Sequence, residues 1–324
     1  MTDRKRVPRG EFDLIARIAA RVSPRPDVVL GIGDDGAILR PPAGHDLVIV
    51  IDTLNQGVHF PQGTAAFDVG WKALAVNLSD LAAMGATPAW CTLALSLPEP
   101  DDAWLDACVD GFLALAGQHG IALVGGDTTR GPLSLTVTAC GFVAAGTALR
   151  RDSAKVGDDI WVSGTLGDAA FALREVLQGR ACADELRARL DRPTPRCALG
   201  QSLVGIAHAC IDVSDGVLQD LGHVCVASGV GAEVRLDALP ASKALAAATE
   251  GVERWRLQSS GDDYELCLTA DPSRHDTLVA LSDSLDVRLA RIGRIIPGSR
   301  VRALDADGRA VQLPAPGYQH FARD

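Results

Sequence analysis

The pattern of apolar and polar positions predicts helices and strands in mixed order along the whole chain. Apolar residues spaced three or four apart predict helices, and short apolar or alternating runs predict strands. The near-continuous apolar run at 47–51 indicates a strand that is buried on both faces. In the amino-terminal half we expect helices at 11–20, 68–84 and from Asp101 or Asp102 to Gly120, and strands at 28–32, 47–51, 121–124 and 133–143.

Residues 150–157 form the predicted joint between two halves of the chain. With 324 residues, the chain is longer than one hydrophobic core normally holds. No short repeat is present, so we predict an α+β fold with two domains, residues 1–149 and 150–324. In the second domain we expect strands at 159–163, 211–213, 232–236, 264–269 and 287–296, helices at 168–177, 197–209 and up to Gly229, and a hairpin turn at 307–308.

Aspartates stand in short breaks that contain Gly, Ser or Thr, beside the apolar stretches. If these carboxylates converged, they would repel one another unless cations were bound between them. Mg²⁺ is a hard cation that accepts carboxylate oxygens and bridges to phosphates, so the pattern predicts a site for a nucleoside triphosphate. The aspartates are Asp34, Asp35, Asp52, Asp80, Asp127 and Asp212, with Asp215 close to the last of them.

Several of these segments also have a simpler interpretation. The run 31–36 matches G-x-G-x-x-G, but Pro41 and Pro42 follow too soon for the helix that a dinucleotide site requires. A plain Asp-Gly turn is the alternative for this run. Asp80 fits either a metal ligand or the solvated face of a helix. The chain contains neither a P-loop motif nor the set of protein-kinase motifs.

Two further segments combine metal-binding and phosphate-binding residue types. In the run 125–131 the glycines allow close approach of a ligand, Asp127 can bind a metal and Arg130 can bind phosphate. The alternative is a polar loop between two strands. In the run 212–216, Ser214 or Asp215 is suited to cap the following helix, whose amino-terminal amides could instead lie near a phosphate.

Composition and charge narrow the class of protein. Hydrophobic residues make up 47% and charged residues 22%, and the net charge of −10 argues against a nucleic-acid partner held by phosphate contacts. The eight cysteines contain no C-x-x-C pair, which favours buried thiols in a reduced, cytoplasmic protein. Neither a signal peptide nor an apolar run of membrane-spanning length is evident, so no membrane partner is expected.

Taken together, these motifs resemble the thiamine-monophosphate kinase family, within the aminoimidazole ribonucleotide synthetase-like ATP-binding superfamily. The resemblance extends over nearly the whole chain, from Gly10 to Phe321. Five ordered motifs carry it: Gly57-Val58-His59-Phe60, the run 77–86 around Asp80, the GGDTTRG run at 125–131, Gly261-Asp262-Asp263-Tyr264-Glu265-Leu266 and the carboxyl-terminal Gly317-Tyr318-Gln319-His320-Phe321.

The resemblance implies a dimer in which the amino-terminal sheets of two subunits form a barrel, with an α+β carboxyl-terminal domain following. It also implies ATP-dependent, Mg²⁺-assisted phosphorylation of thiamine monophosphate to thiamine diphosphate by direct in-line transfer, without a catalytic side-chain nucleophile. By motif, the residues that contact ATP would be Gly126, Asp127, Arg151 and Ser214, and those along the substrate site would be His59, Asp263, Glu265 and Tyr318. The metal ligands would be Asp34, Asp35, Asp52, Asp80, Asp127, Asp212 and Asp215.

The chain departs from the family pattern at two places. The family usually has Ser or Thr before the aspartate at position 52, where this chain has Val50 and Ile51. These side chains have no oxygen, so a weaker or displaced metal ion is one expectation. Gln56 replaces an acidic residue that is common in the family, which removes a negative charge near His59.

Other functions remain open on the sequence alone. Another ATP-dependent synthetase of the superfamily is one alternative, but a selenophosphate synthetase needs a reactive amino-terminal Cys or selenocysteine, and the first cysteine here is Cys91. A hydrogenase-maturation protein of this group would carry a carboxyl-terminal cysteine, whereas this chain ends in Asp324. A sensor that binds ATP or thiamine phosphate without turnover is the non-enzymatic alternative.

Overall fold

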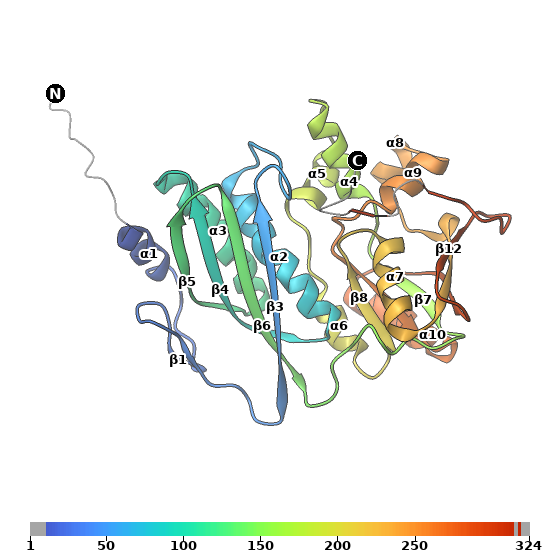
Figure 1. Cartoon of the computed structure of the whole chain (residues 1–324), viewed down its shortest axis with the longest axis horizontal. Coiled ribbons are helices and arrows are strands. Elements are labelled where there is room, and N and C mark those ends of the chain that lie inside the picture. Colours follow the sequence, from blue (N-terminus) through green and yellow to red (C-terminus); the bar gives the residue numbers. More distant parts are fainter. Residues whose placement is uncertain (1–10, 314–316, 319–324) are drawn as a thin grey trace. The chain divides into compact units, whose positions relative to one another are not determined.

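The structure, a computed structural model, describes residues 11–313 and 317–318, with the side chains of residues 11 and 12 left out. These residues form two compact units (Figure 1). The first contains residues 11–43, 49–77 and 89–140, and the second contains residues 44–48, 78–88 and those from 141 onward. Helices and strands are mixed in both, so the predicted α+β class is confirmed.

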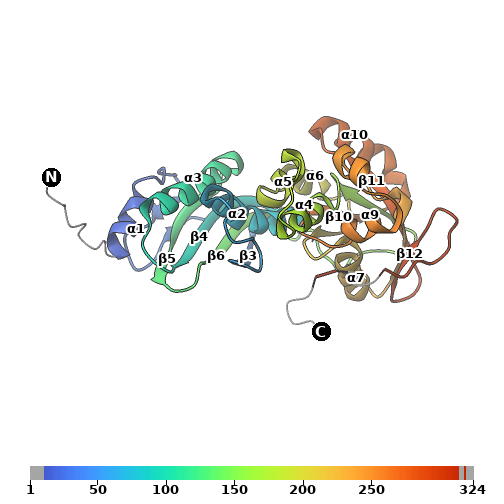
Figure 2. The same ribbon diagram turned by 90° about the horizontal axis from the view of Figure 1, so that it is seen from above.

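The four-stranded sheet has the order β3-β6-β4-β5, and β4 and β5 run parallel. Helices α2 and α3 lie over one face of it (Figure 2). They pack closely because two positions are glycine: a Cβ at Gly70 would lie 1.8 Å from the Cys108 carbonyl oxygen, and one at Gly111 would lie 1.9 Å from that of Phe67. The elements are β3 (His45–Asn55), α2 (Ala66–Ala83), β4 (Thr87–Leu97), α3 (Asp102–His119), β5 (Ala122–Arg130) and β6 (Ser134–Ala144).

Short elements precede this sheet and carry the first pair of aspartates. Helix α1 (Glu11–Ala19) is followed by the antiparallel strands β1 (Val28–Leu30) and β2 (Ile38–Leu39), and the turn between them holds Asp34 and Asp35. The predicted ends of α3 are confirmed: the Asp101 carboxylate accepts hydrogen bonds from two amides of the first turn, and Gly120 closes the helix at φ 62°.

Strand β3 corrects the prediction of a strand buried on both faces. Leu47, Ile49 and Ile51 are 48%, 60% and 63% exposed, whereas Val48 and Val50, which alternate with them, are partly covered. An apolar run indicates that both faces of a strand are suited to burial, but it does not show that residues of the same chain pack against both faces. β3 is an edge strand, and one of its faces presents an apolar row to solvent.

The loop that the sequence predicts after residue 124 is part of strand β5. Residues 125–130 pair in parallel with 92–97 of β4, after a register shift between Cys91 and Thr92. The irregularity in register and the two glycines hide the strand from the sequence pattern, because its alternation is interrupted there.

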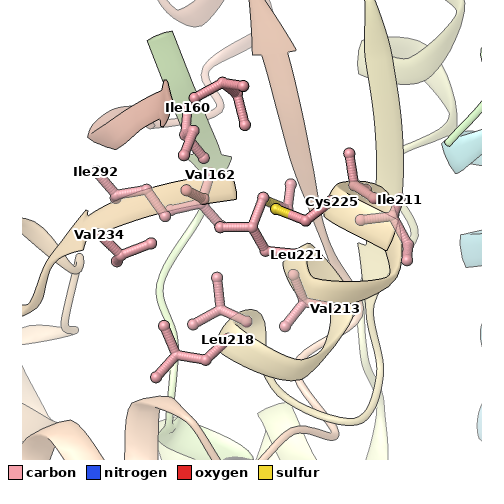
Figure 3. Packing of buried hydrophobic residues seen from close by; sticks show 14 of the residues in the cluster. Ile160, Val162, Ile211, Val213, Leu218, Leu221, Cys225, Val234 and Ile292 are labelled. Carbon is pink, nitrogen blue, oxygen red and sulfur yellow. The ribbon is translucent and has the colours of Figure 1, made fainter. Parts of the chain in front are cut away.

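In the second unit, a six-stranded sheet has the order β12-β9-β11-β7-β10-β8. All of its pairs are antiparallel except β12 with β9. Helix α7 (Val217–Ser228) places Leu218, Leu221 and Cys225 against apolar side chains of the sheet (Figure 3). The strands are β7 (Asp159–Ser163), β8 (Ala209–Val213), β9 (Gly231–Arg235), β10 (Glu265–Ala270), β11 (Leu289–Ile296) and β12 (Val301–Leu304).

Helices α4, α5, α8 and α9 of this unit form a second apolar cluster, in which Phe171, Leu186, Leu190, Leu245 and Leu257 are buried. Besides α7, the helices of the whole unit are α4 (Asp168–Leu177), α5 (Asp184–Asp191), α6 (Cys197–Leu203), α8 (Lys243–Ala248), α9 (Gly251–Gln258) and α10 (His275–Leu285), with short 3-10 turns at Leu236–Ala238 and Pro272–Arg274. Across the described residues both large sheets are open, and no helix is long and apolar enough to span a membrane.

Two predicted helix ends need correction. Helix α2 begins at Ala66, so Asp68 lies in its first turn, where a negative charge is also favourable, and is not the N-cap. The carboxyl-terminal end is as predicted, with Gly85 at φ 70°. The helix expected at 197–209 ends at Leu203, because Gly205 adopts φ 77° and β8 begins soon after it.

Candidate active site

The first unit carries four of the predicted metal ligands. Asp34 and Asp35 are both exposed, and the Asp35 amide donates to Oδ1 of Asp34 at 2.8 Å. Asp52 lies on β3 and Asp127 on β5. Among the described residues, no group of three or more His, Cys, Asp or Glu side chains is arranged to hold a metal ion. The predicted ligands are divided between the units, with Asp80, Asp212 and Asp215 in the second.

Asp127 is exposed on a strand that depends on the glycine before it. Gly126 adopts φ 155°, and a Cβ at this position would lie 1.9 Å from the Leu93 carbonyl oxygen. Only glycine fits that close approach of β5 to β4, so the position of Asp127 follows from strand packing. The exposed carboxylate itself contributes little to that packing.

Val50 and Ile51, which depart from the family pattern, lie on opposite faces of β3. Successive side chains of a strand point to opposite faces, so Val50 shares the face of Asp52, and Ile51 points to the other face. The departure with a direct effect beside the Asp52 carboxylate is therefore Val50. Ile51 belongs to the exposed apolar row of this strand.

His59 is held in a turn with a defined ring orientation. Its Nδ1 accepts a hydrogen bond from the Asn55 amide at 2.9 Å, which leaves the hydrogen of the neutral ring on Nε2. Beneath this turn, Lys72 of α2 is only 2% exposed, and its Nζ donates to the His59 carbonyl oxygen at 3.2 Å. The buried ammonium thus supports the turn that presents the His59 Nε2–H as a donor.

In the second unit, Asp212 at the end of β8 is 4% exposed and accepts a hydrogen bond from the Ser79 hydroxyl at 2.9 Å. Burial, followed by repulsion from Asp80, raises the pKa of Asp212 to about 7, although the Ser79 hydroxyl and the Arg151 guanidinium oppose that shift. The two carboxylates supply hard oxygen ligands, and the positive charge near them does not balance their repulsion. A divalent cation such as Mg²⁺ would suit such a pair.

The loop after Asp212 is shaped by an acid from the helix that follows. Oδ2 of Asp220 accepts hydrogen bonds from the amides of Ser214, Asp215 and Gly216 at 3.1, 3.1 and 3.0 Å. The expectation that Ser214 or Asp215 caps α7 is wrong, because the N-cap is Gly216 and it makes no side-chain bond. Since these three amides donate to Asp220, a phosphate contact from this loop would come from side chains.

The segment that begins at Gly261 closes over the same loop with strained backbone. Asp262 and Tyr264 have φ values of 66° and 52°, a conformation that costs about 1–3 kcal/mol at residues other than glycine. The Asp262 amide donates to the Ser214 carbonyl oxygen at 2.7 Å, and the Tyr264 amide donates to that of Val213 at 2.8 Å. Such strain at a loop that carries predicted ligands is typical of a functional site.

Glu265 and Asp263 are buried and bonded within the protein. Glu265 is fully buried and accepts hydrogen bonds from Ser163 at 2.6 Å, from Arg189 at 2.8 Å and from two nitrogens of Arg196, both at 2.6 Å. Burial raises its pKa, but Arg196 and Arg189 together outweigh burial, so the net pKa is lowered. Asp263 is 1% exposed and accepts from the Gly167 amide at 2.9 and 3.1 Å. This geometry disfavours direct contact of either carboxylate with substrate and favours a supporting role.

Four of these site-shaping residues were missed by sequence reasoning: Lys72, Asp220, Arg189 and Arg196. A lysine within an otherwise apolar helical stretch is an available signal for Lys72. The other three act on segments that only the folded chain brings near, so no local pattern marks them. Tyr318 was predicted, and it lies beside this loop, with its amide donating to the Asp215 carbonyl oxygen at 3.0 Å.

The raised pKa of Asp212 predicts how the metal-free protein responds to pH. Because the pKa of Asp212 is raised in the folded state, the protonated carboxyl stabilises the fold and the ionised one does not. The free energy of unfolding therefore falls as pH rises from about 4 through about 7. Asp212→Asn cannot ionise and should lose less stability over this range. In thermal melts with EDTA from pH 5 to pH 8, the melting temperature of the variant should rise relative to wild type as pH rises. A constant difference would contradict the assigned environment of Asp212.

The chain is similar to known proteins over nearly its whole length. The family model described as AIR synthase related protein, N-terminal domain, matches residues 33–143, and the model for the C-terminal domain of the same family matches residues 155–305. The thiamine-monophosphate kinase of Salmonella typhimurium is 48% identical over 322 residues, which cover 97% of this chain and 98% of that protein.

Solved structures give the same result. The crystal structure of a thiamine-monophosphate kinase from Stenotrophomonas maltophilia K279a has a TM-score of 0.86 and 57% identity, covering 93% of this chain and 98% of that one. AaThiL complexed with AMPPCP and TMP has a TM-score of 0.77 and 29% identity, covering 87% and 89%. With full-length identity at this level, the chain belongs to the thiamine-monophosphate kinase family, among the AIR synthase related proteins.

Proposed function

We propose that the protein transfers the γ-phosphoryl group of ATP directly to thiamine monophosphate, giving thiamine diphosphate and ADP. The observation that carries this proposal is the similarity to thiamine-monophosphate kinases over nearly the whole chain. A related structure that contains AMPPCP, an ATP analogue, together with TMP supports the same pair of substrates.

The chemistry of the acceptor fits the residues present. A phosphate monoester has a second pKa near 6, so its oxygen is already an anion at neutral pH and needs no general base. An acceptor oxygen forms a bond to the γ-phosphorus as the bond from that phosphorus to the β-γ bridging oxygen breaks and ADP leaves. Positioning and charge stabilisation are then the main tasks of the protein.

Mg²⁺ is part of this proposal, with the seven aspartates as its candidate ligands. When bound, the ions would neutralise phosphate charge and align the reacting groups. The Asp80 charge helps to raise the pKa of Asp212, and Arg151 opposes that shift without cancelling it, which supports the fit. Ser214, Arg151 and Gly126 remain the proposed ATP contacts.

We assign a phosphate contact to His59 in the first unit and, separately, a thiamine contact to Tyr318 in the second. The Nε2–H of His59 is a donor suited to a phosphate oxygen, because Nδ1 already accepts the Asn55 amide. Tyr318 is 44% exposed and thus accessible to the thiamine moiety. Asp263 and Glu265 support the start of β10 within the second unit, through the Gly167 amide and two arginines.

The test is ADP release measured with ATP, Mg²⁺ and either thiamine monophosphate or thiamine. We expect rapid, Mg²⁺-dependent turnover with the phosphate acceptor and much slower turnover with thiamine, whose neutral hydroxyl needs a base. Comparable rates with both acceptors would sink direct attack by the acceptor phosphate. Binding of both substrates without turnover would favour a sensor.

A homodimer is also part of the proposal, and the exposed row on β3 supports it. Ile49 and Ile51 offer an apolar surface on an edge strand, which proteins normally cover. Ile49→Lys should therefore shift the protein from dimer to monomer in sedimentation velocity at micromolar concentration. Val226→Lys is the control, since Val226 is 77% exposed on α7 and lies outside this row. A monomeric wild type, or an Ile49→Lys dimer of unchanged strength, would contradict this interface.

A further inference from the structure

Gln219, in the first turn of α7, bonds to two segments that have different proposed roles. Its Nε2 donates to Oδ2 of Asp215 at 3.1 Å and to the carbonyl oxygen of Tyr318 at 2.8 Å. Asp215 is a candidate metal ligand, and Tyr318 is a candidate contact for the thiamine moiety. A side-chain amide has two N–H groups, so one glutamine can serve both acceptors at once.

The backbone of the carboxyl-terminal segment is seated on the same loop. The Tyr318 amide donates to the Asp215 carbonyl oxygen at 3.0 Å. A Cβ at Gly317 would lie 2.4 Å from Oε1 of Gln219 and 2.8 Å from the Asp215 carbonyl oxygen, so only glycine permits this approach. Segment 317–318 is thus fixed by Asp215 and Gln219 on both sides of the Tyr318 peptide.

We propose that Gln219 is a positioning residue that couples the acceptor site to the metal site through its bonds to Tyr318 and Asp215. The inference rests on the proposed function and extends it, because it assigns a role to a residue that contacts neither substrate. By holding the Asp215 carboxylate, Gln219 limits the directions in which that group can offer Oδ2. By holding the Tyr318 carbonyl, it sets where the phenol ring can lie.

Asp220 provides the fixed frame for this coupling. Its bonds to the three amides of 214–216 hold the backbone of Asp215, while Gln219 holds the Asp215 side chain. The consequence is specific: loss of the Gln219 amide should leave the loop backbone in place and free only the carboxylate and segment 317–318.

The experiment uses Gln219→Leu, which keeps the side-chain volume and removes both donors. Calorimetric titration with thiamine monophosphate, without ATP, should show affinity weakened about 5- to 10-fold, the loss expected for one such bond. The Mg²⁺ concentration at the midpoint of a thermal-shift titration should rise by a similar factor. Gln118→Leu, at an exposed position on α3, is the matched control and should change neither value.

A double-mutant cycle separates positioning from a merely structural effect. If Gln219 acts on the substrate through the Tyr318 ring, Gln219→Leu should cause no further loss of thiamine monophosphate affinity in a Tyr318→Ala background, while its effect on Mg²⁺ should persist. Fully multiplicative losses, or unchanged affinities in Gln219→Leu, would overturn the inference. A wild type that fails to bind thiamine monophosphate would instead contradict the proposed function.

Discussion

Asp127→Asn is expected to lower turnover of thiamine monophosphate by about 100-fold or more while leaving the fold intact. Without this charge the bound metal ion would stabilise the transition state less, by several kcal/mol. The carboxylate is exposed on β5, and the strand is held by pairing with β4 and by the close approach at Gly126. Circular dichroism and thermal melting should therefore match wild type, and steady-state ADP release should not.

Two results would change the role assigned to Asp127. A melted variant would mean that the carboxylate has a structural partner, and near-normal turnover would remove it from the proposed metal ligands. Glu99→Gln is a suitable control, because it removes an exposed carboxylate that lies outside the five motifs. That variant should keep turnover within about threefold of wild type, as expected for a surface change.

Glu265→Ala is expected to destabilise the second unit by about 3–5 kcal/mol, the usual consequence of removing one partner from a buried ion pair. The substitution leaves the Arg189 and Arg196 side chains, 18% and 17% exposed, without the carboxylate that both contact. Denaturant unfolding followed by fluorescence should show the loss. Glu99→Ala removes an exposed acid and should shift stability by no more than about 0.5 kcal/mol.

The same variant separates support from substrate contact. If Glu265 touched the thiamine moiety directly, Glu265→Ala would retain stability and raise only the KM for thiamine monophosphate. The stability of Glu265→Gln should lie between that of wild type and that of Glu265→Ala, since glutamine keeps the volume and the hydrogen-bond acceptor but loses the charge. A stable Glu265→Ala protein would falsify the supporting role assigned to this residue.

Much of the fold could be predicted from the sequence where local signals decide it. Asp101 and Gly120 mark the ends of α3, and Gly85 and Gly229 end two further helices, because capping and positive φ are local requirements. The sequence predicts a loop at Gly126, because the pairing of this strand with β4 is non-local. The sequence does not predict the exposure of Ile51, because apolarity alone does not identify what covers a strand.

In the candidate site, too, local features could be predicted from the sequence and non-local contacts could not. Its aspartates could be picked out because each follows an apolar stretch and interrupts it. Their supports could not: Asp220 reaches back to residues 214–216, and Arg196 meets Glu265 from 69 residues away in the sequence. The burial of Asp263 and Glu265 is equally hidden in the sequence. The resemblance places both along the substrate site, whereas in the structure their carboxylates accept hydrogen bonds from within the protein.

The most direct test of the central claim follows the transferred phosphate itself. The purified protein would be mixed with ATP labelled in its γ-phosphate, Mg²⁺ and thiamine monophosphate, and the products of a single turnover would be separated. Direct transfer predicts that the label appears in the terminal phosphate of thiamine diphosphate as ADP forms. Label released as inorganic phosphate, with thiamine monophosphate unchanged, would contradict it.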